Sequence, residues 1–231
     1  MKSKALEVNR RLAQVLEDRR KRTRPDAIAE LVSTILSQNT NDALRDKAYR
    51  SLRQRFPTWE QVCEASEEEL VAAIRIAGLS QHKAPAIQRA LRRIHAERDG
   101  WSLGFLRGMP VEEAKQWLTS IKGIGPKTAA IVLLFALDMP AFPVDTHIHR
   151  VTRRLGLIPT EASREKAHEL LEAIFPPEHY YAAHLSLIRL GREVCQARKP
   201  RCEACVLRDL CDYFSTTACP SSYATPIDPP E

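Results

Sequence analysis

Four cysteines lie within seventeen residues near the C-terminal end of the chain, at Cys195, Cys202, Cys205 and Cys211. Thiolates at such short spacing are ligands for zinc or for an iron–sulfur cluster. The N-terminal residues lack the apolar core of a secretory signal, so we expect metal binding rather than disulfides. Zinc sites often show two Cys-x2-Cys pairs, whereas here only Cys202 and Cys205 have that spacing. The cluster therefore predicts a metal centre.

A glycine-rich turn between two helices is the second feature with chemical content. A helix is expected to end near Ile121, Gly123-Ile124-Gly125 forms the turn, and Pro126 suits the first position of a new helix. The two glycines permit positive φ and a close approach of the backbone to another surface, with Ile124 packed inward. Amide groups at the new helix N-terminus can bind an anion. An ordinary helix–turn–helix corner is the plainer alternative, but the longer pattern favours a hairpin that binds DNA phosphates without reading sequence.

Lys127 stands in the first turn of that new helix. Most lysines are solvated surface charges, and this is the ordinary interpretation. The helix macrodipole, however, places partial positive charge at this end, which disfavours an ammonium and makes a neutral amine accessible. A lysine nucleophile needs that condition to attack a sugar carbon.

The positions of apolar residues predict a chain built of helices. Apolar spacing of three and four residues predicts helices over 28–36, 70–74, 87–94, 114–121, 129–137, 148–155, 167–174 and 181–188. Asp145 directly precedes one of these helices and is a preferred N-cap. Residues 216–231 are rich in Pro, Ser and Thr and are expected to form a disordered tail. With no alternating strand pattern, the expected fold class is all-α.

Charge and composition narrow the partners. The 231-residue chain has a formal net charge of +6 and a pI of about 9.1, which fits a polyanionic partner. Basic runs occur at 19–22, 150–154 and 198–201; the first is best explained as a solvated helix face. No run of about 18 apolar residues is present, so no membrane span is expected. We expect a monomer in the cytoplasm, associated with the nucleoid.

The stretch from Ile121 to Leu155 resembles the helix-hairpin-helix DNA glycosylase superfamily, and the 6-2-5 spacing of the cysteines resembles its endonuclease III branch. The resemblance runs from roughly residue 10 to residue 213. It implies that the four cysteines hold a [4Fe–4S] cluster. This interpretation is favoured over a zinc site, and a zinc site is favoured over free thiols. Lys122 stands where the family usually has proline, a change expected to affect the rigidity of the turn more than the chemistry.

The resemblance also implies a catalytic pair. The lysine at the position of Lys127 is the family's nucleophile: it displaces the damaged base at C1′, forms a Schiff base and nicks the strand by β-elimination. The Val-Asp-Thr-His string matches the family's catalytic aspartate at Asp145, which would stabilise positive charge on the sugar and assist proton transfer. His147 in that string would support the site through DNA contact, with a satisfied helix histidine as the alternative.

Further residues are implied as DNA contacts. A glycosylase extrudes its target nucleotide, and side chains must fill the gap. In the loop 36–42, Asn39 takes the family's usual glutamine position, with Gln38 beside it as the alternative. Leu79 resembles the leucine that wedges into the duplex, although Ser80 and Gln81 after it depart from the common residues. The basic loop contributes a phosphate contact through Arg198, Lys199 and Arg201.

The sequence thus predicts an all-α, two-domain helix-hairpin-helix glycosylase fold. A helical barrel domain is expected over 25–138, and an iron–sulfur cluster domain over 1–24 plus 139–215. The predicted function is removal of oxidised pyrimidines from damaged double-stranded DNA, followed by strand cleavage as an abasic-site lyase. The alternatives are a monofunctional mismatch glycosylase of the same superfamily and a non-catalytic DNA-binding iron–sulfur protein.

Overall fold

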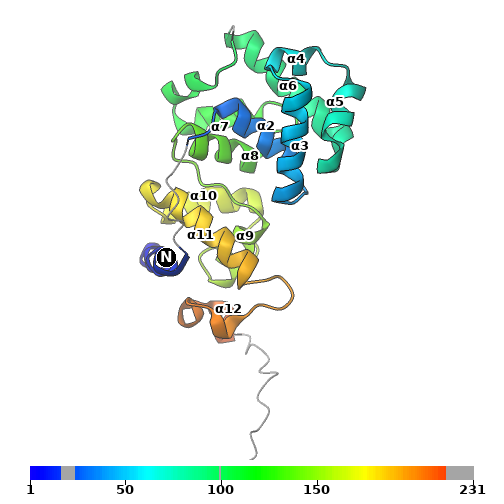
Figure 1. Cartoon of the computed structure of the whole chain (residues 1–231). Coiled ribbons are helices and arrows are strands. Elements are labelled where there is room, and N and C mark those ends of the chain that lie inside the picture. The colour runs from blue at the N-terminus through cyan, green and yellow to red at the C-terminus, as the bar shows by residue number, and fades with distance from the viewer. Residues whose placement is uncertain (17–23, 99, 217–231) are drawn as a thin grey trace, which may run out of the picture. The chain divides into compact units, whose positions relative to one another are not determined.

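The computed structural model describes residues 1–16, 24–98 and 100–216, and these residues form helices and connecting loops without a β-strand (Figure 1). The expectation of an all-α chain is confirmed. The described residues divide into two compact units, one made of residues 24–143 and the other of residues 1–16 with 144–216. The boundary between the two units lies after Pro143, whereas the sequence predicted a domain boundary after residue 138.

The unit of residues 24–143 is a set of short helices around α2. Its α-helices are α2 (Ala27–Ser37), α3 (Asp42–Arg55), α4 (Trp59–Glu64), α5 (Glu67–Ile74), α6 (Ser80–Arg98), α7 (Val111–Thr119) and α8 (Pro126–Ile131). Two short 3-10 helices, η1 (Arg75–Ala77) and η2 (Gly104–Gly108), join them. Buried aliphatic side chains of α2 pack against α3, α6 and α8. Their burial supplies most of the driving force for this unit.

Side-chain caps set where several of these helices begin. Asp26 accepts a hydrogen bond from the amide of Ala29 at 2.9 Å and so starts α2. Asn41 does the same for α3 through the amide of Leu44, also at 2.9 Å. α4 and α5 each begin with a reciprocal capping box. Of these caps, Asn41 fixes the end of the loop that joins α2 to α3.

The apolar run after the hairpin is buried, as its composition predicts, but its geometry changes along the way. α8 is regular only to Ile131, and the chain continues as a π-helical segment, η3 (Val132–Ala136). The guanidinium of Arg107 donates to the carbonyl oxygens of Ala136 and Leu137 at 3.1 and 3.2 Å, which satisfies the end of this segment. Because the segment is apolar on all sides, side-chain periodicity could not reveal the wider turn.

The second unit brings the two ends of the described chain together. It contains α1 (Lys2–Leu16), α9 (Thr146–Arg154), α10 (Arg164–Ile174), α11 (Tyr180–Glu193) and α12 (Asp212–Thr216), with the 3-10 helices η4 (Pro177–His179), η5 (Cys202–Ala204) and η6 (Arg208–Leu210). α11 packs against both α1 and α9. Ion pairs from α1 reach the C-terminal segment: Lys4 contacts Asp212 and Arg11 contacts Asp209, each at 2.6 Å.

Some expectations fall on residues that the structure does not describe. The basic run 19–22 lies entirely in that part of the chain, as do residues 217–231 of the expected tail. Thr216, where that tail was expected to begin, is the last residue of α12. In the described residues, no helix is long and apolar enough to cross a bilayer.

Candidate functional site

The turn between α7 and α8 is held in place by one glycine and one buried isoleucine. Gly123 has φ +105°, and a Cβ built on it would lie 2.7 Å from Cβ of Ala86 in α6. Ile124 is only 4% exposed and its amide donates to the carbonyl of Ile121 at 3.0 Å. The expected inward packing of Ile124 is present. The turn therefore depends on a glycine at 123, which has positive φ and no room for a side chain, and on the buried side chain of Ile124.

The remaining glycine of the turn is open to approach. Gly125 is exposed, has φ −96°, and a Cβ on it would meet nothing within 4 Å. Pro126 follows at the first position of α8, as the sequence predicts. The hairpin thus combines a packed side at Gly123 with an open backbone at Gly125, where a phosphate group could come close to the main chain.

Lys127 follows in the first turn of α8 and is half-buried. Among the described residues its Nζ forms no hydrogen bond and no ion pair. The preceding Pro126 and the following Thr128, which is 3% exposed, fix the backbone on which it stands. The amine of Lys127 is therefore not committed to another residue that the structure describes.

Asp145 is the N-cap of α9 and is also half-buried. Its Oδ1 accepts a hydrogen bond from the amide of Ile148 at 2.7 Å. Its Oδ2 makes no hydrogen bond with any residue that the structure describes. The capping role is therefore present, and it uses only one of the two carboxylate oxygens. Lys127 belongs to the unit of residues 24–143, and Asp145 to the other.

His147 is held on α9 by an arginine that the sequence did not single out. An N–H of Arg150 donates to Nδ1 of His147 at 3.1 Å, which places the ring proton on Nε2. Arg150 also donates to the carbonyl oxygens of Gly191 and Cys195, at 2.8 and 3.0 Å. A Cβ on Gly191 would lie 2.8 Å from Cβ of His147, so α9 and α11 meet here without spare room. His147 is thus a satisfied helix histidine on its Nδ1 side.

The loop after α2 distinguishes the two residues proposed as gap fillers. The side-chain amide of Gln38 donates to the carbonyl of Gly123 at 3.3 Å and to Oγ1 of Thr128 at 3.5 Å, so it is tied to the hairpin. Asn39 has φ +51° and is exposed. The geometry favours Asn39 over Gln38 as the side chain that can meet a ligand.

The second loop presents Leu79 in the same way. Leu79 has φ +50°, a backbone conformation that residues other than glycine rarely adopt, and it is 51% exposed. Gly78 before it has φ +68° and ends η1, as expected of a helix-terminating glycine. Ile76 is exposed nearby in the chain, at 46%. The loop therefore offers apolar side chains to solvent.

A buried lysine joins the roots of these two loops, and sequence reasoning did not identify it. Lys83 is 2% exposed, and its Nζ donates to the carbonyl oxygens of Leu36 and Ala77 at 2.8 and 2.9 Å. Burial lowers the pKa of this ammonium. Leu36 lies just before the Asn39 loop and Ala77 just before the Leu79 loop. No spacing rule in the sequence indicates such a link.

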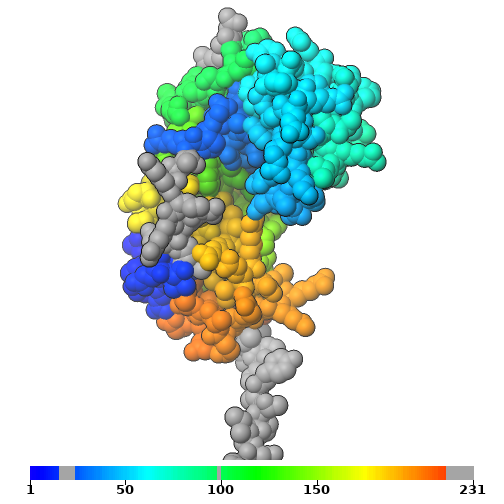
Figure 2. Space-filling model, in the orientation of Figure 1, coloured from blue at the N-terminus to red at the C-terminus, as the bar shows by residue number. Residues whose placement is uncertain are grey.

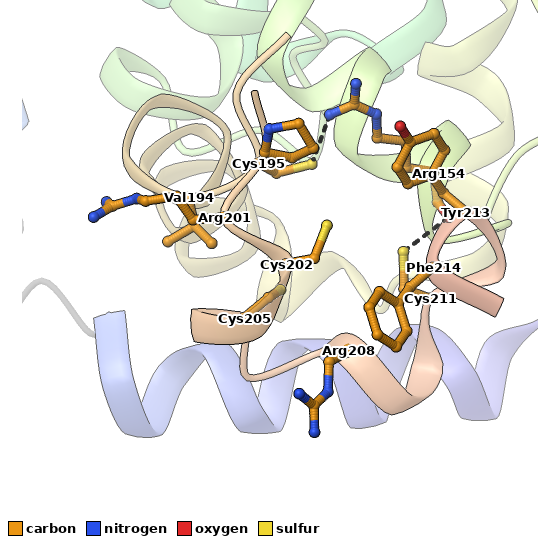
Figure 3. A pocket seen from close by; sticks show the side chains of 11 residues that line it. Arg154, Val194, Cys195, Arg201, Cys202, Cys205, Arg208, Cys211, Tyr213 and Phe214 are labelled. Carbon is orange, nitrogen blue, oxygen red and sulfur yellow. Dashed lines mark hydrogen bonds between the residues drawn. The ribbon is translucent and has the colours of Figure 1, made fainter. Parts of the chain in front are cut away.

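The four cysteines surround a cavity in the other unit. All four line it, together with Arg154, Arg201 and Arg208 among others (Figure 3). In the described residues, no three His, Cys, Asp or Glu side chains converge closely enough to hold a single ion. Thiol ligands spaced around a cavity suit a multi-atom cluster better than one zinc ion, whose four sulfurs would each lie about 2.3 Å from it.

The electrostatics of the cavity also suit a thiolate-bound cluster. Burial raises the pKa of the Cys205 and Cys211 thiols, and the neighbouring Cys195 raises them further. A cluster must therefore displace protons as it binds. Arginine side chains at the rim offset the negative charge that four thiolates bring. The residues present fit an iron–sulfur cluster.

The basic residues in the loop between Cys195 and Cys202 differ in their contacts. Arg198 and Lys199 are exposed, and Figure 2 shows side chains of this part of the chain projecting from the surface. Arg201 instead turns back, and its guanidinium donates to the carbonyl of Glu193 at the end of α11. Arg201 thus ties the loop back to α11, although it is itself exposed, as Arg198 and Lys199 are.

Comparison with known proteins identifies the family. A model described as an HhH-GPD superfamily base excision DNA repair protein matches residues 32–177. A second, described as the iron–sulfur binding domain of endonuclease III, matches residues 195–211, which start at the first of the four cysteines and end at the last. The two models together cover the hairpin, Lys127, Asp145 and the cysteine loop.

Individual relatives agree with this assignment. Endonuclease III of Thermotoga maritima is 32% identical over 189 residues, covering 82% of this chain and 84% of that protein. Endonuclease III of Sulfolobus acidocaldarius is 34% identical over 191 residues, covering 82% and 83%. A protein of Arabidopsis thaliana described as a putative DNA glycosylase is 38% identical over 169 residues; the match covers 73% of this chain but 58% of that longer protein.

Solved structures show the same fold. A trapped endonuclease III–DNA covalent intermediate superposes with a TM-score of 0.81 and 28% identity, covering 93% of this chain and 97% of that one. A thermostable thymine-DNA glycosylase shares the fold at a TM-score of 0.75 and 22% identity. The chain therefore belongs to the HhH-GPD superfamily of base excision DNA repair proteins and, within it, to the endonuclease III family of DNA glycosylases, which carry a [4Fe–4S] cluster.

Proposed function

We propose that this chain removes oxidised pyrimidines from double-stranded DNA and then cleaves the abasic site through a Schiff base on Lys127. The observation that carries the proposal is the amine of Lys127, which is half-buried in the first turn of α8 and has no partner among the described residues. A solved relative is a trapped endonuclease III–DNA covalent intermediate, which supports a covalent step in this family.

The first step forms a bond between the lysine and the sugar. Nζ of Lys127, as a neutral amine, attacks C1′ of the extruded nucleotide, and the damaged base leaves with the electron pair of the glycosidic bond. The nitrogen then loses a proton. The C1′–O4′ bond breaks as the C1′–Nζ double bond forms, and O4′ takes up the proton that the nitrogen lost. The sugar ring is then open, and a protonated imine links protein and DNA.

Asp145 supports this step with the oxygen that the helix cap does not use. Oδ1 is occupied by the amide of Ile148, and Oδ2 remains to stabilise the positive charge on the sugar and to accept the proton from Nζ. Asp145 is positioned by the start of α9, as Lys127 is by the start of α8. His147, whose Nδ1 accepts a hydrogen bond from Arg150, is proposed to support the site through a contact with DNA.

The second step cuts the strand. The protonated imine makes the C2′ protons acidic; removal of one of them expels the 3′ phosphate with the electron pair of the C3′–O bond. Water then hydrolyses the imine and returns the amine of Lys127. The strand is nicked on the 3′ side of the lesion, which is the β-lyase reaction.

Two loops are proposed to fill the space that the extruded nucleotide leaves. Asn39 offers an exposed amide and Leu79 an exposed apolar wedge, both on backbones with positive φ. The open backbone at Gly125 and the exposed charges of Arg198 and Lys199 are proposed to contact phosphates, which positions the duplex without reading its sequence.

The [4Fe–4S] cluster, held by Cys195, Cys202, Cys205 and Cys211, supplies a fixed cross-link in the C-terminal segment and no atom to the reaction. We propose that a single copy of the chain binds the DNA and that it acts where chromosomal DNA lies, in the nucleoid. Gel filtration with light scattering at a concentration that saturates a short lesion duplex would give the number of copies bound.

The function is tested with a duplex that contains one thymine glycol. Base release and strand nicking are measured separately for the wild type, for Lys127→Ala and for Lys122→Ala. Lys122 is the matched control, because it is an exposed lysine of the same hairpin. The wild type and the control are expected to release the base and nick the strand, and Lys127→Ala is expected to do neither beyond about 1% of the wild-type rate.

Other outcomes contradict the proposal in distinct ways. Base release by the wild type without nicking would indicate a monofunctional glycosylase. Binding without base release on a panel of lesions would indicate a non-catalytic DNA-binding protein. Nicking by Lys127→Ala at the wild-type rate would show that another group is the nucleophile.

A further inference from the structure

We propose that Arg154 controls the electron affinity and the retention of the iron–sulfur cluster through a direct hydrogen bond to one of its ligands. Arg154 is the last residue of α9, and its Nη1 donates to Sγ of Cys195 at 3.3 Å. Figure 3 shows this contact at the wall of the cavity. The inference concerns the cofactor alone and does not depend on the catalytic role proposed for Lys127.

The arginine is held in this position by further contacts of its guanidinium. Nη1 also donates to the carbonyl of Gln196 at 2.7 Å, and Nη2 donates to the carbonyl of Ala197 at 2.9 Å. The guanidinium carbon lies 4.7 Å from the centre of the Tyr213 ring, which follows the last cysteine in the chain. One side chain thus braces both ends of the cysteine loop.

The main chain of the same residue contacts a second ligand. The thiol of Cys211 lies 3.2 Å from the carbonyl oxygen of Arg154 and donates to it in the absence of metal. Arg154 is therefore next to the first and the last of the four cysteines, which are the two farthest apart in the sequence.

The other arginines near the cluster differ in this respect. Arg201 is committed to the carbonyl of Glu193, and Arg208 to the carboxylate of Glu203 at 2.5 Å. Arg150 reaches the carbonyl oxygen of Cys195, not its sulfur. The contact of Arg154, in contrast, is to the sulfur of a ligand.

The physical consequence is a stabilised reduced state. An added electron raises the negative charge on the cluster and on its thiolate sulfurs, and a cationic N–H donor at one of them stabilises that charge. The midpoint potential is therefore higher with Arg154 than without it. The hydrogen bonds from Arg154 to the carbonyl oxygens of Gln196 and Ala197 have a second effect. They hold the cysteine loop in place and so slow the loss of iron.

Adjacent arginines of α9 provide a matched control. Arg153 is exposed, whereas Arg154 is half-buried against the cysteine loop. Arg153→Gln and Arg154→Gln remove the same charge from neighbouring positions, but only the second removes the hydrogen bond to sulfur. Arg154→Lys keeps the charge and loses the fork that reaches three acceptors.

The experiment uses the full chain purified with its cluster, without DNA. The midpoint potential is measured by voltammetry, and cluster loss in air is followed by the visible absorbance and by iron per chain. Arg154→Gln is expected to have a lower midpoint potential than Arg153→Gln and to lose iron about 10-fold faster. Arg154→Lys is expected to lie between Arg154→Gln and the wild type in potential, and to lose iron faster than Arg153→Gln.

Equal potentials and equal rates of iron loss in Arg154→Gln and Arg153→Gln would overturn the proposal. If Arg154→Gln is recovered without its cluster while Arg153→Gln retains it, the role in cluster retention is supported. The role in the midpoint potential is then tested by comparing Arg154→Lys with Arg153→Gln. An Arg154→Lys protein that matches Arg153→Gln in both measurements would also overturn it.

Discussion

At the scale of single residues, Asp145 carries two roles that can be separated. Its Oδ1 caps α9 through the amide of Ile148, and its Oδ2 is the group proposed to act on the sugar. An asparagine caps a helix as well as an aspartate does, because its side-chain oxygen accepts the same hydrogen bond. The amide, however, carries no charge and accepts no proton.

Asp145→Asn is therefore expected to change the free energy of unfolding by less than about 0.5 kcal/mol, while base removal falls about 100-fold or more. Asp145→Ala is expected to lose the cap as well, at a cost of about 1 kcal/mol. Denaturant unfolding and single-turnover base release measure the two effects. Full base removal by Asp145→Asn would leave the cap as the only role of this residue.

Residue-level prediction from sequence succeeded where a local pattern carries the information. The turn glycines and the N-cap position of Asp145 follow from backbone chemistry that is local in the chain. The choice between Gln38 and Asn39 could not be made, because it depends on the contact of Gln38 with Gly123, which is distant in sequence. Lys83 was not identified for the same reason, since its partners are carbonyls of two separate loops.

At the scale of elements, the hairpin between α7 and α8 contains two glycines with different requirements. Gly123 needs positive φ and the absence of a side chain, because Ala86 stands 2.7 Å from where a Cβ would be. Gly125 has an ordinary φ and open space around it. The first glycine is therefore needed for the fold, and the second is free to serve a ligand.

Gly123→Ala is expected to lower the free energy of unfolding by about 1–3 kcal/mol, through backbone strain and the clash with α6. Gly125→Ala is expected to leave stability within about 0.5 kcal/mol of the wild type and to weaken binding to an uncleavable abasic-analogue duplex, because its methyl group blocks the open backbone. Unfolding curves and binding titrations measure both. Unchanged affinity in Gly125→Ala would exclude this backbone as a phosphate contact.

Helices that bury a stripe of apolar side chains were predicted, because that spacing is local in the chain. The helix α3 was not predicted; it buries only Ala48 and Leu52, so its apolar pattern is weak. The stretch after the hairpin shows a further limit. An apolar run carries no periodicity, so the sequence indicated a buried helix but not the π-helical turn of Val132–Ala136. The change in geometry depends on packing within the unit, which no local pattern records.

At the scale of the whole molecule, the described chain divides into two units, and different internal contacts stabilise each of them. The unit of residues 24–143 has a continuous apolar core. The C-terminal segment of the other unit has short 3-10 turns around a cavity, and its remaining contacts include ion pairs to α1. Exposed ion pairs contribute little, so the cluster must supply much of the order in that segment.

Removal of the iron is therefore expected to act on one unit only. Hydrogen exchange should accelerate in residues 195–216 and in α1, which is tied to them by Arg11 and Lys4, while residues 27–137 keep their protection. Exchange measured by mass spectrometry before and after chelation would show this pattern. A uniform loss of protection would show instead that the cluster supports the entire chain.

Borohydride trapping tests the central claim most directly. The protein is incubated with a duplex containing one thymine glycol or one abasic site, reduced with borohydride, and the covalent complex is digested to find the modified peptide. The account predicts a trapped complex with the modification on Lys127, retained in Lys122→Ala and absent in Lys127→Ala. A trapped complex through another amine, or none on either duplex with a folded protein that binds DNA, would contradict the assignment of Lys127 as the nucleophile.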